Sequence, residues 1–200
     1  MTLADRTAIK YRGKMAKGYE AKRKKQQRWD IENKMVTTLL QRLPHGSTVL
    51  DCPVGTGRYL PDYDRLGLYP YGIDSSEEML ALAAKKGFTH VELENADARN
   101  LPWPDKSVDA VVSVRFLDLI DEAAMKKCMA EFMRVARHTI ILTIRVGAKY
   151  VLKSNTATHD GEKFLRMIQR AGWKRMAALP IFKQGWHVVL LERTQRSKHR

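Results

Sequence analysis

Short apolar segments alternate with helix-compatible segments along most of this 200-residue chain. Strand-sized apolar runs lie at 48–52, 69–74, 89–94, 109–114, 138–145, 173–182 and 186–193. A strand, a crossover helix and a parallel strand make a right-handed unit, so repeated alternation builds a parallel sheet with helices on both faces. The last two runs flank the short turn Lys183-Gln184-Gly185, which predicts a hairpin that adds an antiparallel strand at one edge. We therefore predict an α/β fold with a Rossmann-like, doubly wound sheet of about seven strands, mostly parallel with an antiparallel last strand.

Local signals place the helices between these runs. A long segment without proline, 15–43, carries one apolar stripe at Ile31, Met35, Leu39 and Leu43. Further helices are predicted at 57–66, from Ser75-Ser76 to Gly87, at 121–136, and at 160–171 with Asp160 as the cap. Between 145 and 159 the sequence indicates only a short loop and no inserted domain.

Positive charge is concentrated at the two ends of the chain. The net charge is +14, and residues 1–30 carry ten basic against three acidic side chains, while 193–200 carry four basic ones. We predict a basic N-terminal arm with a lid helix at 1–30, one domain at 31–193, and a basic tail at 194–200. Two interpretations of these arms remain open. They bind polyanions such as nucleic acid, or they only keep the protein in solution.

Other features bound the class of protein. No apolar run approaches the ~20 residues that a membrane span requires, and the first ten residues lack the apolar core of a secretory signal. Two cysteines, Cys52 and Cys128, make neither a disulfide framework nor a zinc site. We expect a cytoplasmic protein with no metal site and no membrane span.

The turn after the first apolar run is rich in glycine. Gly55 and Gly57 permit positive φ and close approach of a ligand to the backbone. Leu60 stands where a dinucleotide fingerprint has its third glycine, which argues against NAD or FAD. A phosphate-binding G-x-x-x-x-G-K-[ST] loop does not occur in the sequence, so a nucleotide triphosphatase is unsupported.

Carboxylates follow three successive strands. Asp51 ends the first strand, Asp74 ends the second, and Asp97 comes just after the third. Ligands of an open α/β sheet bind beyond the carboxyl ends of the strands, and a carboxylate there can accept the hydroxyls of a ribose. Each residue alone reads as a turn or cap residue. Together they predict a pocket for a nucleoside that carries positive charge and no phosphate.

With these motifs the sequence resembles the class I S-adenosylmethionine (SAM)-dependent methyltransferases, and among them the small UbiE-type branch, over about residues 15–193. VLDCPVGTGRYL resembles the glycine-rich first motif, with Pro53 in place of the first glycine, and GIDSSEEML the ribose-binding strand end. ENADARNLPWPDKSVDAVVSV resembles the adenine-contacting segment and fourth strand, FLRMIQRAGW the late helix, and MAKGYE the segment over the cofactor.

The resemblance implies SAM as the cofactor and assigns its contacts. Asp51, Pro53, Gly55 and Gly57 would line the methionine and ribose end, Asp74 would hold the ribose, and Met79 would lie beside the adenine. Asp97 and Ala98 would read the adenine edge, Val114 and Arg115 would approach the reacting end, and Tyr19 is a lid candidate.

No catalytic residue is assigned, because the sulfonium already activates its methyl group and a base is needed only for an acceptor that holds its proton. The candidates are Arg115, Asp118 and His159. Arg115 either binds an acidic acceptor or pairs with Asp118. His159, next to the cap at Asp160, reads more simply as a surface residue.

Three functions fit the sequence. The first is in-line methyl transfer to a small-molecule acceptor. The second is methylation of RNA or DNA held by the basic arms, with Tyr11, Tyr19 and Trp29 interleaved. The third is a protein that binds SAM without transferring methyl. The N-P-P-Y, D-P-P-Y and Pro-Cys signatures of nucleic-acid enzymes are absent from the sequence, which favours the first.

Overall fold

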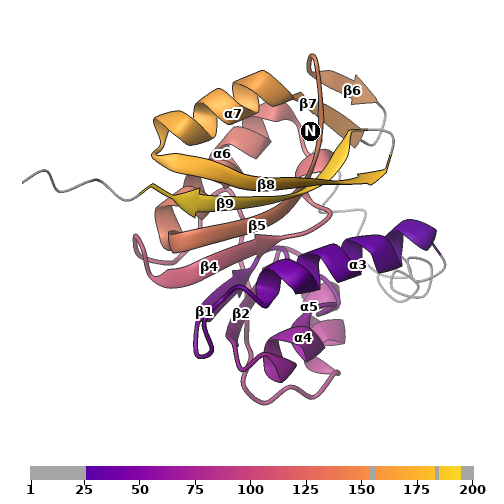
Figure 1. The fold of residues 1–200 in the computed structure, drawn as a ribbon. Coiled ribbons are helices and arrows are strands. Elements are labelled where there is room, and N and C mark those ends of the chain that lie inside the picture. The colour runs from indigo at the N-terminus through magenta and orange to yellow at the C-terminus, as the bar shows by residue number, and fades with distance from the viewer. Residues whose placement is uncertain (1–25, 154–155, 183–184, 195–200) are drawn as a thin grey trace, which may run out of the picture.

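The computed structural model describes residues 26–153, 156–182 and 185–194 (Figure 1). Its strands are β1 (Thr48–Asp51), β2 (Tyr69–Asp74), β3 (Glu92–Asn95), β4 (Val108–Ser113), β5 (Ala136–Gly147), β6 (Val151–Lys153), β7 (Thr156–Asp160), β8 (Trp173–Phe182) and β9 (Trp186–Arg193). Its helices are α3 (Gln27–Leu40), α4 (Leu60–Arg65), α5 (Glu77–Ala84), a 3₁₀ turn η1 (Leu117–Leu119), α6 (Glu122–Val135) and α7 (Gly161–Arg170).

The main sheet has the order β3-β2-β1-β4-β5-β9-β8. Neighbours from β3 to β5 are parallel, whereas β9 is antiparallel to both β5 and β8. The predicted mostly parallel sheet with an antiparallel last strand is confirmed. The last strand, however, lies inside the sheet and β8 forms the edge, because residues 188–191 of β9 are buried and need a neighbour on each side.

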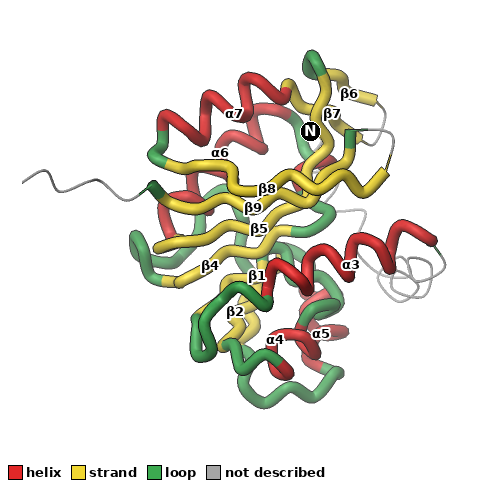
Figure 2. The backbone as a smooth tube through the Cα atoms, viewed as in Figure 1, coloured by secondary structure: helices red, strands yellow, loops and turns green. Residues whose placement is uncertain are grey.

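Apolar side chains cover both faces of the sheet, which is why its central strands read as continuous apolar runs. On one face α6 and α7 pack Phe132 and Ile168 against the strands. On the other, α3, α4 and α5 contribute Leu40, Tyr63 and Ala83. Figure 2 shows these helices on opposite sides of the strands.

The N-terminal helix packs its predicted apolar stripe against the core. The described part begins at Gln27, so α3 runs across the domain boundary predicted between residues 30 and 31. Its face toward the sheet is centred on Val36, Leu39 and Leu40, which are buried, and the other predicted stripe residues, Ile31, Met35 and Leu43, are partly buried against the same cluster. The rest of the predicted arm, Tyr19 included, and residues 195–200 of the tail lie outside the described residues.

The prediction that residues 145–159 form only a short loop was wrong. β5 continues to Gly147, β6 and β7 form an antiparallel pair, and β7 adds to the end of β5 through Val146 and His159. The capping predictions were correct. Asp160 accepts a hydrogen bond from the backbone N–H of Lys163, and Ser76 accepts one from Met79.

Within the described residues, no helix combines the length and the apolar character needed to cross a membrane.

Candidate functional site

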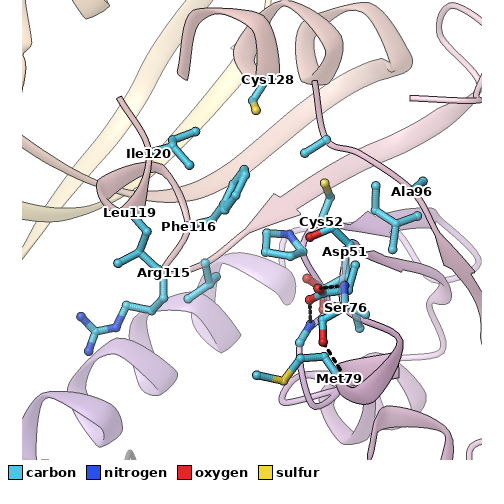
Figure 3. Close-up of a pocket in the computed structure, with 18 of the residues that line it drawn as sticks. Asp51, Cys52, Ser76, Met79, Ala96, Arg115, Phe116, Leu119, Ile120 and Cys128 are labelled. Atoms are coloured by element: carbon cyan, nitrogen blue, oxygen red, sulfur yellow. Dashed lines mark hydrogen bonds between the residues drawn. The ribbon is translucent and has the colours of Figure 1, made fainter. Parts of the chain in front are cut away.

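A cavity opens beyond the carboxyl ends of β1, β2 and β4 (Figure 3). The predicted cofactor contacts that line it are Asp51, Pro53, Gly55, Asp74, Met79, Asp97, Ala98, Val114 and Arg115. Gly57 is not among its lining residues, and Tyr19 is outside the described part of the chain. Residues that end or follow four separate strands, β1 to β4, therefore meet in one cavity, as the sheet topology predicts.

Asp74 joins the end of β2 to the glycine turn. Its Oδ2 atom accepts a hydrogen bond from the backbone N–H of Gly55 at 3.0 Å, and its Oδ1 atom accepts one from Ser76 at 2.9 Å. Gly55 has φ of 56° and would carry a Cβ into open space, with no atom within 4 Å. The turn thus presents bare backbone to the cavity.

Gly57 serves the packing of the turn. Its φ is 72°, and a Cβ there would lie 2.6 Å from Cδ1 of Leu60 and 3.2 Å from Cβ of Ala83. The Cys52–Pro53 peptide bond that leads into the turn is cis.

Asp51 is the most deeply buried acid of the cavity. It is 2% exposed, and its Oδ2 atom has no hydrogen-bond partner within the described residues. Burial raises the pKa of Asp51 from 3.8 to about 8, against the lowering effect of the nearby Tyr63 hydroxyl. Burial also raises the pKa of Asp74 to about 6, opposed by its backbone hydrogen bonds. A bound cation would restore the ionised form of both carboxyls.

Asp97 lies at the cavity in an ion pair that the sequence reasoning missed. Its carboxylate accepts hydrogen bonds from Nε and Nη2 of Arg99, the latter at 2.7 Å, and from the Arg99 backbone N–H at 2.8 Å. The side chain is 47% exposed. Its expected contact with an adenine remains a prediction.

A buried ion cluster lies beside the cavity and contributes Arg58 and Arg115 to its lining. Glu32 on α3, fully buried, pairs with Arg58 after the glycine turn and with Nε of Arg115 at 3.0 Å. Arg58 also stacks on Trp29, its guanidinium carbon 3.4 Å from the ring centroid, and donates to Asn33. Helix α3 is thereby tied to two of the loops that form the cavity.

The candidate ion pair of Arg115 with Asp118 was wrong, since Arg115 pairs with Glu32 instead. Arg115 has φ of 61°, and its backbone N–H donates to Oγ1 of Thr143 at 2.6 Å. Figure 3 shows its side chain extended away from Phe116 and Asp51. Asp118 is buried within η1 and is not among the lining residues.

His159 is a core residue, which corrects the surface position expected for it. It is fully buried in β7, and its Nε2–H donates to the carbonyl oxygen of Leu117 at 2.7 Å. Burial lowers its pKa, so the ring is neutral near pH 7. It does not line the cavity, and its place is to anchor η1 to β7.

No group of three or more His, Cys, Asp or Glu side chains suited to a metal ion occurs in the described ranges. Cys52 and Cys128 are both free and buried at the cavity wall, and burial raises the pKa of each thiol.

Residues 49–139 match the family model described as methyltransferase domain. A tRNA (carboxymethyluridine(34)-5-O)-methyltransferase from Arabidopsis thaliana is 35% identical over 118 residues, which are 56% of this chain and 27% of that protein. A phosphatidylethanolamine N-methyltransferase from Cereibacter sphaeroides is 39% identical over 97 residues, 46% of each chain. A demethylmenaquinone methyltransferase from Bacillus licheniformis, 30% identical over 112 residues (53% of this chain, 48% of that protein), supports the predicted branch.

Among solved structures, the 1,6-didemethyltoxoflavin-N1-methyltransferase from Burkholderia thailandensis has the same fold. It is 16% identical, with a TM-score of 0.72 over 96% of this chain and 91% of that one. The chain spans from about a quarter to about half of the length of the curated relatives named above. The family match identifies residues 49–139 as a methyltransferase domain, and the strand order and the glycine turn agree with the predicted resemblance to the class I SAM-dependent methyltransferases.

Proposed function

We propose that this chain binds SAM in the cavity beyond β1, β2 and β4 and transfers its methyl group to a small-molecule acceptor. The observation that carries this proposal is the pair of buried carboxyls, Asp51 and Asp74, beside the bare backbone of Gly55. Burying two acids next to each other costs free energy, which a cationic ligand between them offsets.

Three of the assigned contacts support this proposal. Asp74, held in place by Gly55 and Ser76, can accept hydrogen bonds from the two hydroxyls of a ribose. The buried Oδ2 atom of Asp51 has an open hydrogen-bonding position for an ammonium group. Met79, buried at the start of α5, offers an apolar contact for the adenine.

Bound SAM supplies an electrophilic methyl carbon: its bond to sulfur breaks as a bond to the acceptor's lone pair forms, and the electron pair stays on sulfur. The protein's part is to align the two reactants and to exclude water, which in well-oriented reactions supplies ~7–11 kcal/mol of the barrier. Phe116, Leu119 and Ile120 form an apolar wall suited to exclude water. The acceptor's proton, where it has one, leaves to solvent.

Helix α3 is placed to cover the acceptor side. Trp29 and Arg58 line the cavity from that side, and Glu32 holds the helix there. The described ranges contain no inserted domain between β5 and α7, only the short β6–β7 pair. Both features favour an acceptor small enough to enter the cavity.

A nucleic-acid acceptor is the second candidate function. The concentration of basic residues in 1–30 favours it, as does the likeness to an enzyme named for its action on tRNA. Binding through those residues would weaken steeply as salt rises, because each neutralised phosphate releases a counterion.

The test is transfer of a labelled methyl group from SAM into fractionated cell extract by the full chain, with and without nuclease treatment. Asp74→Asn provides the matched inactive control. Label that enters a low-molecular-weight fraction and survives nuclease is the expected result. Label lost on nuclease treatment supports the nucleic-acid acceptor, and SAM binding without transfer to any fraction contradicts a methyltransferase activity.

A further inference from the structure

The candidate cavity is lined by charges of both signs. Asp51 and Asp74 form its acidic end, and its basic end is formed by Arg115, which Glu32 links to Arg58. Figure 3 shows Arg115 and Asp51 on opposite sides of Phe116. A cationic cofactor accounts for the acidic end and leaves the basic end without an explanation.

The basic end carries an excess of positive charge. One carboxylate, Glu32, is shared by two guanidinium groups, those of Arg58 and Arg115. The side chain of Arg115 is only 8% exposed, and its buried Nη2 atom has no hydrogen-bond partner within the described part of the chain. A buried charged donor without an acceptor is costly, so an acceptor supplied by a ligand would be favoured there.

More guanidinium groups gather around a neighbouring aromatic ring. The guanidinium carbon of Arg115 lies 5.0 Å from the centroid of the Trp186 ring, and those of Arg28 and Arg145 lie at 5.8 Å and 5.9 Å. These arginines come from α3, from the end of β5 and from the loop after β4. The fold thus brings three guanidinium groups to one aromatic ring beside the cavity.

The backbone holds Arg115 in place at some cost. Its φ of 61° is a left-handed conformation that non-glycine residues seldom adopt, and the Thr143 hydroxyl fixes it through the backbone N–H. Conformations of this kind persist where surrounding structure enforces them, and they cluster at binding and catalytic sites. Here the guanidinium group pairs with Glu32 of α3 and lies 5.0 Å from the centroid of the Trp186 ring.

We propose that the acceptor of this protein carries an anionic group, a carboxylate or a phosphate, which the Arg115 guanidinium binds beside Trp186. The proposal rests on the proposed function, since it names the acceptor class of the same cavity. The anion occupies the basic end, and the apolar body of the acceptor lies against Phe116 and Leu119. That arrangement directs the other end of the acceptor toward the acidic side, where the methyl donor binds.

The test uses small aromatic probes on the full chain saturated with S-adenosylhomocysteine, whose binding is first measured by calorimetry. Benzoate and phenyl phosphate are the anionic probes, and benzamide is the uncharged probe of matched shape. Binding is followed by quenching of tryptophan fluorescence. We expect both anions to bind at least about tenfold more tightly than benzamide, as charge-assisted hydrogen bonds do. The stronger of the two anions then identifies the group as carboxylate or phosphate.

Three variants test whether Arg115 causes the preference for anionic probes. Arg115→Gln should abolish the preference for anions, Arg115→Lys should restore part of it, and Arg166→Gln, an exposed arginine on α7, should leave it unchanged. S-adenosylhomocysteine affinity, measured on each variant, reports whether the cavity is intact. If Arg115→Gln does not fold, the proposal is tested by the preference of the wild-type protein for anions over benzamide and by the partial loss of that preference in Arg115→Lys.

Two results would overturn the proposal while leaving the proposed function standing: benzoate and benzamide binding equally, or no saturable binding of either anion, with S-adenosylhomocysteine still bound. A short single-stranded RNA of mixed sequence that binds with steep salt dependence, while the small anions show no preference, would also overturn it. Absence of S-adenosylhomocysteine binding would instead contradict the proposed function itself.

Discussion

The buried carboxyl of Asp51 makes the stability of the ligand-free protein depend on pH. Its pKa is about 8 in the folded chain and near 3.8 when exposed. Between these values the unfolded chain has lost a proton that the folded chain keeps, so the free energy of unfolding falls as pH rises, by about 1.4 kcal/mol per pH unit. The contribution of Asp51 to stability is therefore full at acid pH and is lost by about pH 8.

Asp51→Asn removes this dependence because the amide stays neutral. From pH 6 to pH 8 the wild-type chain should lose about 2–3 kcal/mol relative to the variant, which corresponds to a relative fall in Tm of about 5–10 °C for a chain of this size. Thermal unfolding of both proteins, followed by circular dichroism over this pH range without ligand, measures the difference. Asp64→Asn, at an exposed acid of α4, is the matched control.

The reasoning would be refuted if the wild-type and Asp51→Asn proteins had parallel curves of Tm against pH. A large excess of SAM supplies a second check. It should raise the Tm of the wild type, by the equivalent of about 2.7 kcal/mol at a hundredfold excess over Kd, and should raise that of the variant much less.

Three further outcomes are expected. Gly57→Ala should lower the free energy of unfolding by at least 1 kcal/mol more than Gly55→Ala does in urea titrations, because both have positive φ and only at Gly57 would the Cβ meet Leu60; equal losses would contradict the packing role. Glu32→Gln should lower the free energy of unfolding by about 3 kcal/mol in the same titrations, since it leaves Arg58 and Arg115 without their buried carboxylate. Asp30→Asn, on an exposed residue of α3, should leave that free energy nearly unchanged. His159→Asn should flatten the loss of stability below pH 6.5, because the lowered pKa keeps the folded imidazole neutral where the unfolded one is charged; an unchanged acid limb in thermal scans would show that His159 titrates normally.

The parts of the fold that follow from local sequence could be predicted. Residues 69–74 and 173–182 form the strands that their apolar runs indicate, with the same bounds. Asp51 and Asp74 could be located because each ends a run whose neighbours are parallel strands, and parallel strands bring their carboxyl ends to one edge. The parallel arrangement of the strands places the cavity at their carboxyl ends, so the residues that end the strands could be predicted to line it.

The ion cluster of Glu32, Arg58 and Arg115 could not be predicted in the same way. Its members are far apart in the chain, and a sequence with 36 basic and 22 acidic residues offers too many possible pairs to choose among. His159 was misplaced for a different reason. β7 has the sequence TATHD, in which Ala157 and His159 are buried, and this pattern lacks the apolar alternation that indicates a strand. The adjacent cap at Asp160 was the only visible signal.

The most direct measurement for the whole account is calorimetric titration of SAM into the purified full chain at neutral pH, in two buffers of different ionisation enthalpy. We predict one-to-one binding with release of protons, mainly from Asp51, because its pKa of about 8 keeps it protonated at neutral pH while Asp74, with a pKa of about 6, is already largely ionised. We also predict much weaker binding to Asp51→Asn. A folded chain that takes up no SAM, or binds it equally well without either carboxylate, would contradict this account.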